Sequence, residues 1–170
     1  MNQQLTKFLA EAEHSPFKRG LLNKILAHTI PFNKPHSLDI KEISPSTVKV
    51  KLPYKKSNLN HVRGLHACGL ATAAEYTSGL LLLRRLGSED YRLIMKSLSV
   101  DYVYQGKSDA TASFKLSDAE YAEKISLPLE SDESVLFDAV VEVHDAQQNL
   151  LCTATITWQI KPWRLVKTKS

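Results

Sequence analysis

Two hydrophobic periods alternate along the chain, and they separate predicted helices from predicted strands. After Ser15-Pro16, an apolar residue recurs every three or four positions: Phe17, Leu21, Leu22, Ile25 and Leu26. This period, with a hydroxyl at the cap and a proline in the first turn, predicts an amphipathic helix over roughly 16–28. From Thr47 the period falls to two, because Val48, Val50 and Leu52 are separated by lysines. That alternation predicts a strand with one solvent-exposed face.

The longest apolar stretch runs from Leu65 to Leu86 and is followed by Gly87. It predicts a helix that the glycine ends and that other parts of the protein cover on nearly every side. Four stretches then alternate apolar with other residues at a period of two, over roughly 98–104, 110–116, 137–143 and 152–160. They predict about four strands in a meander, and Ser117-x-x-Glu120 predicts a capped short helix between the second and the third.

This order of elements indicates an α+β fold, in which one antiparallel sheet wraps around a long central helix and extra helices precede it. The length of 170 residues is that of one ordinary domain. We therefore expect a single domain over 1–170. Its parts are an N-terminal helical extension (1–35), a core (36–163) and a basic tail (164–170).

The net charge of +4 comes from 22 Lys and Arg against 18 Asp and Glu, spread along the chain. Nucleic-acid binders usually carry a larger and more clustered positive charge, so we expect no nucleic-acid partner. The most basic stretch contains Lys161, Arg164, Lys167 and Lys169. These residues could meet phosphate groups, although a solvated tail is the ordinary interpretation.

Cys68 and Cys152 are the two cysteines, and neither has metal-ligand spacing around it. Two isolated thiols fit a reducing compartment, so we expect a cytoplasmic protein without a metal. The stretch 65–83 contains no Lys, Arg or Asp, but it does contain His66, Glu75 and several hydroxyl residues. We therefore interpret it as a helix buried in protein rather than in a membrane.

Glu75 stands out because it is the only acidic residue between Leu65 and Leu86. A buried carboxylate is costly unless it is paired, hydrogen-bonded or neutralised by a raised pKa, and such residues gather at functional sites. The residues alone leave two interpretations open. Glu75 is either a site residue, or a solvated or backbone-capping side chain.

The segment Asn60-His61-Val62-Arg63-Gly64-Leu65-His66, continued by Ala67-Cys68-Gly69 and six further residues to Glu75, resembles a known motif. It is similar to the motif of hot-dog-fold thioesterases of the phenylacetic-acid-pathway type. In that family an Asn, a Gly-containing turn, a His six positions on and an acid nine positions further recur, and both spacings match. The resemblance covers roughly 39–162 and extends to a poorly characterised branch with longer N-terminal helices. It implies a single hot-dog domain.

The resemblance also implies an activity, the hydrolysis of an acyl-coenzyme A without cofactor or metal. Glu75 would be the catalytic carboxylate, acting as general base or nucleophile. The backbone N–H of Ala67 would polarise the thioester carbonyl, and Asn60 would position the water or the acid. His66 completes the candidate catalytic set, although a helix-start His that only hydrogen-bonds its own loop is equally compatible.

His66 and Glu75 are nine residues apart, which places them on opposite sides of one helix at about 100° per residue. A site that uses the helix start and Glu75 therefore most simply combines two subunits. This agrees with the interface-shared sites that the resemblance implies. We expect a homodimer, or a dimer of dimers.

The chain departs from the motif where the family has Gly-Gly after the His, because Ala67-Cys68 stands there, and where Arg63 replaces a Gly. The substrate-binding candidates are Gly64, Cys68, Ser97 and Ser99. Cys68 is close to the proposed site, but we expect a buried structural thiol. Ser97 and Ser99 are more commonly ordinary sheet hydroxyls. The departures favour an alternative, a non-catalytic acyl-CoA-binding protein on the same fold.

Overall fold

The computed structural model describes residues 3–167. Its strands form one antiparallel sheet in the order β1-β2-β4-β5-β6-β3. The strands are β1 (Asp39–Ile43), β2 (Thr47–Leu52), β3 (Tyr91–Tyr102), β4 (Ala110–Lys115), β5 (Val135–Asp145) and β6 (Leu150–Pro162). The α-helices are α1 (Gln3–His14), α2 (Pro16–Thr29), α3 (Ala67–Leu86), α4 (Asp118–Tyr121) and α5 (Leu127–Ser131). A single π-helical turn joins α4 to α5.

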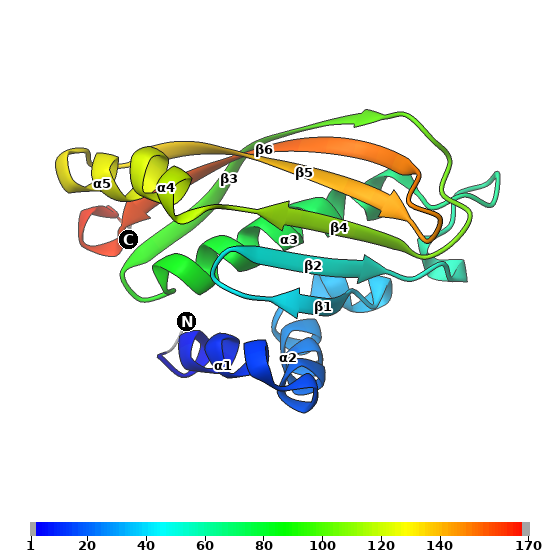
Figure 1. The fold of residues 1–170 in the computed structure, drawn as a ribbon, viewed down its shortest axis with the longest axis horizontal. Coiled ribbons are helices and arrows are strands. Elements are labelled where there is room, and N and C mark those ends of the chain that lie inside the picture. The colour runs from blue at the N-terminus through cyan, green and yellow to red at the C-terminus, as the bar shows by residue number, and fades with distance from the viewer. Residues whose placement is uncertain (1–2, 168–170) are drawn as a thin grey trace.

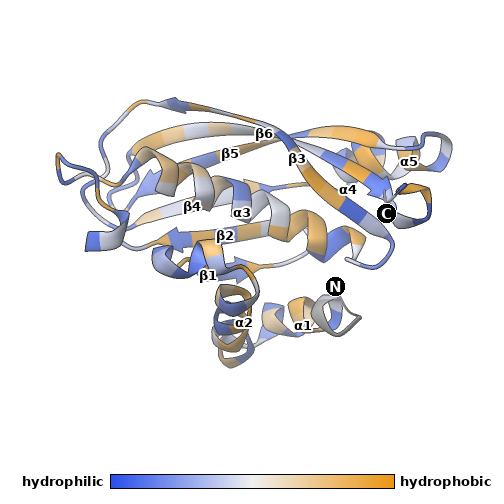
Figure 2. Cartoon of the chain, turned by 180° about the vertical axis from the view of Figure 1, so that it is seen from behind, coloured by the Kyte–Doolittle hydropathy of each residue, from blue (hydrophilic) through white to orange (hydrophobic). Residues whose placement is uncertain are grey.

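The long helix α3 lies across one face of the sheet, and the core fills the space between them (Figure 1). Figure 2 shows the molecule from behind, with α3 in front of the sheet and β3 crossing near its C-terminal half. Leu81 and Leu82 of α3 are fully buried, as are Val141 of β5 and Ile156 of β6. Each buried side chain of this size contributes roughly 1.5–3 kcal/mol to folding. The predicted α+β arrangement is therefore present.

The start and end of α3 follow from its terminal residues. His66 precedes the helix as its cap, and its Nδ1 accepts a hydrogen bond from the backbone N–H of Cys68 at 3.1 Å. Gly87 ends the helix at a φ of 74°, a conformation that glycine adopts without steric cost. The predicted helix end is confirmed, whereas the start lies two residues later than Leu65.

The helix predicted over 16–28 is confirmed as α2, whose cap Ser15 accepts from the N–H of Lys18 at 3.3 Å. Leu22 and Leu26 provide its buried face. Phe17 of the four-residue repeat is 81% exposed, so part of the apolar pattern marks the outer side of the helix.

Three polar contacts join α1 and α2 to the rest of the molecule. Arg84 of α3 forms an ion pair with Glu13 of α1 at 3.0 Å. Asn23 of α2 donates to Asp39 at 2.7 Å and accepts from the N–H of Ile40 at 2.9 Å. Figure 1 shows both helices outside the sheet, next to β1 and α3. No strand of the sheet is formed by them.

The prediction of a four-strand meander is wrong. Of the four strands β3 to β6, only β4, β5 and β6 follow one another across the sheet, whereas β3 pairs with β6 at the far edge and β4 pairs with β2. Hydrophobic period shows which residues share a face, but it carries no information on which strands pair. The strand β1 was not predicted, because its five residues include three charged ones.

The short helix α4 begins as predicted, since the Ser117 hydroxyl accepts from the N–H of Glu120 at 3.1 Å. Among residues 3–167, no helix has both the length and the apolar character needed to cross a membrane.

Candidate active site

A cavity of about 350 Å³ lies between α3, the start of β3 and the two N-terminal helices. Its lining is mostly apolar and comes from five segments of the chain. Representative residues are Leu9 of α1, Leu26 of α2, Glu75 and Gly79 of α3, Arg92 of β3 and Trp158 of β6. Small-molecule sites typically have this volume and an apolar lining with few polar groups.

Glu75 is half-buried and lines this cavity. Its carboxylate has no hydrogen-bond or ion-pair partner within the described part of the chain. Burial raises the pKa of this carboxyl above its ordinary value of 4.5, because the charged form loses hydration. A carboxylate in such surroundings is a stronger base than one in water, as proton abstraction requires.

We expect stability to depend on pH through Glu75, and the sign follows from its raised pKa. Between 4.5 and the raised value, the folded state holds a proton that the unfolded state has lost. The stability that protonated Glu75 contributes to the folded state is therefore fully present below pH 4.5. It is lost as the pH rises through the pKa of the folded state. Glu75→Gln stays neutral, so its melting temperature should fall less than that of the wild type between about pH 4 and about pH 8. Equal falls in both proteins would show that Glu75 is solvated.

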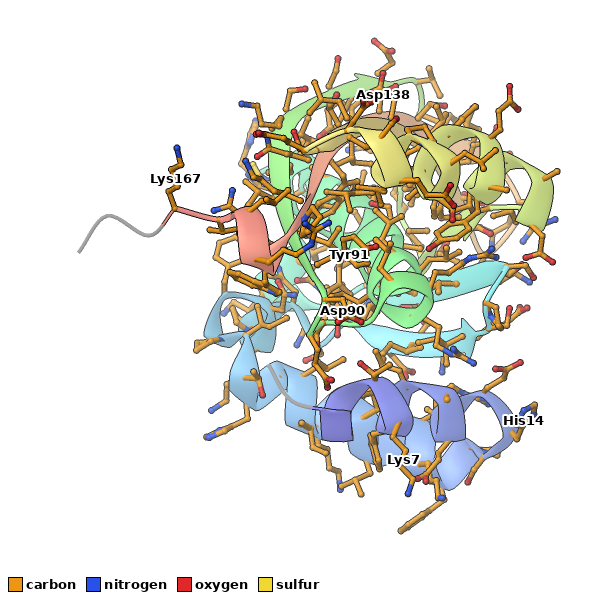
Figure 3. The ribbon with its side chains drawn as sticks, turned by 90° about the vertical axis from the view of Figure 1, so that its left-hand side faces the viewer. Lys7, His14, Asp90, Tyr91, Asp138 and Lys167 are labelled. Atoms are coloured by element: carbon orange, nitrogen blue, oxygen red, sulfur yellow. The ribbon has the colours of Figure 1, made fainter. Side chains whose placement is uncertain are left out.

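Two tryptophans from the end of the chain shape the cavity. Trp158 donates through Nε1 to the Ser78 hydroxyl at 3.0 Å, and a methyl group on Gly79 would lie 3.2 Å from its ring. Trp163 is tied to the loop before β3, because its backbone N–H and its Nε1 donate to the carbonyls of Asp90 and Ser88. Figure 3 shows Asp90 at this loop, between α1 and α2 below and α4 and α5 above. Sequence reasoning did not place either tryptophan at the site, since each reads as an ordinary apolar residue.

The start of α3 presents one free backbone donor. The N–H of Ala67 has no acceptor among residues 3–167, while the N–H of His66 donates to Asn58 and that of Cys68 to the His66 ring. The Tyr102 hydroxyl donates to the Ala67 carbonyl at 2.9 Å and holds this turn against the end of β3. His66 therefore caps the helix, and Ala67 keeps the N–H that an oxyanion could use.

The Asn60 side chain organises its own loop. Its Oδ1 accepts from the N–H groups of Val62 at 3.1 Å and Gly64 at 2.9 Å. This leaves the Asn60 amide nitrogen, rather than its oxygen, for contact with a ligand. Gly64 is buried, and a methyl group there would approach the Gln105 side chain to 2.7 Å. The glycine therefore fits the loop to the segment after β3 and offers little surface to a substrate.

Arg63 has a φ of 60°, the left-handed conformation that the resembled motif fills with glycine. A non-glycine residue there costs roughly 1–2 kcal/mol, partly offset by the higher entropy of glycine in the unfolded chain. We expect Arg63→Gly to raise the free energy of unfolding by about 1 kcal/mol. Urea denaturation would measure this change, with Arg63→Ala as the control because it keeps the strained conformation. A glycine variant no more stable than the alanine variant would contradict this account.

Cys68 is exposed, so the prediction of a buried structural thiol is wrong for this residue. It lies in the first turn of α3, directly before the buried residues Gly69 and Leu70. Cys68, Thr72 and Glu75 follow one another at helical spacing, and they share one partly exposed face of α3. The Thr72 hydroxyl donates to the Cys68 carbonyl of the same helix at 2.7 Å, and Thr72 lies outside the cavity. Cys152 is buried, which raises the pKa of its thiol to about 11.

The structure does not bring all the predicted site residues together in one chain. Glu75 lines the cavity, whereas His66 and Ala67 lie at the start of α3 and outside the cavity. Ser97 and Ser99 are exposed on β3, opposite Thr157 and Thr155 of β6, and they also lie outside the cavity.

In the part of the basic C-terminal stretch that the structure describes, Lys161 forms an ion pair with Glu133 at 3.7 Å. Arg164 and Lys167 are exposed, and Lys169 is outside the described residues. Between residues 3 and 167, no group of three or more His, Cys, Asp or Glu side chains is arranged to hold a metal ion.

Comparison with solved structures identifies proteins with a similar fold. A Pseudomonas aeruginosa protein of unknown function, named a probable thioesterase, matches with a TM-score of 0.76 and 19% identity, over 84% of this chain and 95% of its own. A Chlorobaculum tepidum protein of unknown function matches with a TM-score of 0.72 and 12% identity, over 88% of this chain and 98% of its own. A Haemophilus influenzae thioesterase matches with a TM-score of 0.66 and 12% identity, over 88% of this chain and 92% of its own. None of the curated proteins matches the sequence.

These structures share a fold with the chain, and they confirm the hot-dog α+β fold that the resemblance implied. The sequence itself matches the family model "Domain of unknown function (DUF4442)" over residues 18–160, which is most of its length. The protein is therefore a hot-dog-fold member of the DUF4442 family.

Proposed function

We propose that this protein is a cytoplasmic acyl-CoA thioesterase whose site is shared between two copies of the chain. One observation carries the proposal: Glu75, a half-buried carboxylate without a partner among the described residues, lines an apolar cavity of about 350 Å³. An apolar cavity suits an acyl chain, and an unpaired carboxylate beside it suits the activation of water. The fold relatives named as thioesterases support the same reaction class.

The reaction assigns one role to the start of α3 and another to Glu75, near the middle of the helix. Glu75 takes a proton from water, and the water oxygen forms a bond to the thioester carbon. The negative charge moves to the carbonyl oxygen, which the N–H of Ala67 from the other copy stabilises. The carbon–sulfur bond then breaks, and the coenzyme A thiolate leaves and takes up the proton that Glu75 accepted, which restores the carboxylate.

A second copy is needed because Ala67 and Glu75 do not line the same cavity in one chain. The edge strand β3 is the surface that we propose for this contact. It is 12 residues long and exposes Ile94 and Met95, by 44% and 43%. A long edge with exposed apolar residues invites pairing with another strand.

A second candidate function is the binding of acyl-CoA without turnover. The specific observation in its favour is the Asn60 oxygen, which is already occupied by the N–H groups of Val62 and Gly64. Asn60 is then a loop residue and does not position water through that oxygen. Ala67-Cys68 in place of two glycines points the same way, because it leaves less room at the start of α3.

The test is the release of free thiol from short, long and aromatic acyl-CoAs by the wild type. Hydrolysis of any of them above the blank supports the thioesterase. Saturable binding of acyl-CoA without thiol release would replace it with the binding function.

A further inference from the structure

Arg92 is the second residue of β3, and it lines the same cavity as Glu75. It is half-buried, and its Nε is fully enclosed without a hydrogen-bond partner. Among residues 3–167 it forms no ion pair. Arg84 is a useful comparison, because its Nε is also enclosed and unpaired, but its guanidinium is neutralised by Glu13 at 3.0 Å.

An arginine in this position is costly without an anion. The guanidinium carries five N–H donors and remains charged, and a buried charge without a partner destabilises the fold. The cavity removes part of its hydration and the protein returns no acceptor. A carboxylate or phosphate group in the cavity would supply both the charge and the acceptors, in the paired geometry that guanidinium favours.

Glu75 is not that anion, although it lines the same cavity. No ion pair joins the two residues, and burial is the sole cause of the raised pKa of Glu75, with no cation lowering it. The carboxylate and the guanidinium therefore lie apart around one mostly apolar space. A ligand that satisfies both is elongated, with an uncharged polar group near Glu75 and an anionic group near Arg92.

We propose that Arg92 is the anion-binding residue of this cavity, and that the ligand is an amphiphile with an apolar chain and a carboxylate or phosphate group. This inference rests on the proposed function in placing the thioester beside Glu75. The anionic group has two possible sources in such a substrate. It is either a carboxylate at the far end of the acyl group or a phosphate of the carrier that bears it.

The first experiment measures binding without any turnover. Decanoate, decyl phosphate and decanol are titrated into the wild type, Arg92→Gln, Arg92→Lys and the control Lys115→Gln, which removes an exposed cation of β4 outside the cavity. A hydrogen-bonded ion pair predicts that the wild type binds an anion about tenfold or more tightly than the alcohol. This ratio should fall to near one in Arg92→Gln, persist in part in Arg92→Lys and stay unchanged in Lys115→Gln.

Two results would overturn the proposal. One is an anion preference that survives Arg92→Gln. The other combines two observations: the wild type shows no preference for an anion, and Arg92→Gln changes the mass of the assembly. Arg92 would then pair with a residue of the second copy. Neither result depends on hydrolysis, so the thioesterase proposal can fail while the anion site stands, and the reverse.

The second experiment identifies the source of the anion. Binding to Glu75→Gln is compared for coenzyme A thioesters with and without a terminal carboxylate, and for truncated thioesters that lack phosphates. A preference for the terminal carboxylate in both series, abolished by Arg92→Gln, assigns Arg92 to the acyl group. A preference for full coenzyme A that Arg92→Gln abolishes assigns it to the carrier phosphate. Insensitivity of both preferences to Arg92→Gln contradicts the proposal.

Discussion

Glu75→Gln is expected to reduce acyl-CoA hydrolysis by about two to four orders of magnitude, the usual effect of losing a positioned acid–base group. Glutamine keeps the shape of the side chain but cannot take a proton from water. The cavity lining and the packing of α3 should remain, so the Michaelis constant should change little. Steady-state release of thiol measures both parameters.

Glu130→Gln is a suitable control, because Glu130 is an exposed glutamate of α5 outside the cavity. It should leave turnover within about twofold of the wild type, as surface substitutions do. Wild-type turnover in Glu75→Gln would remove Glu75 from the chemistry and leave it as a cavity residue only.

Ala67→Pro should lower turnover by about two to three orders of magnitude, the usual effect of losing one oxyanion donor. Proline has no N–H, yet it is favoured at the first position of a helix. The preceding residue, His66, already has a ψ of 136°, in the region that proline requires of its neighbour. The deleted N–H has no acceptor within residues 3–167, so folding should lose little. Ala67→Ser keeps the N–H and should retain activity.

Mixing the two inactive variants tests whether the site is shared. In a hybrid dimer of Ala67→Pro with Glu75→Gln, one site carries both defects and the other carries none. Random mixing of a two-fold dimer then restores about a quarter of wild-type activity. Light scattering of each variant, with a mass of twice 19.1 kDa expected, shows that dimers are present. Dimers without restored activity would place both groups in one chain and refute the shared site.

Much of the fold was predictable, because local chemistry determines it. The Ser15 cap, the Gly87 stop and the alternation of Val48 and Val50 each specify an element through its own residues. The pairing of β3 with β6 was not predictable, since it depends on contacts between strands about 60 positions apart. The edge strand β3 also begins earlier than predicted, at Tyr91, because its first residues are partly exposed and show no clean alternation.

The candidate site was also predictable only in part. Glu75 was conspicuous as the lone acid of an apolar helix, and the structure places it at a cavity. Arg92 and Trp163 gave no comparable signal, because their position at that cavity results from tertiary packing. The status of Cys68 could not be read from the sequence either, since exposure at the first turn of a helix depends on what covers that turn.

The helices α1 and α2 close one side of the cavity through Leu9 and Leu26, yet they form no strand of the sheet. Their ties to the rest of the molecule include the Arg84–Glu13 ion pair and the Asn23 hydrogen bonds. Leu22 and Leu26 of α2 are also buried in the core, so apolar packing holds this outer wall as well as these polar contacts. Because the wall is a layer separate from the sheet, substitutions within it can change the shape of the cavity while every strand pair remains intact.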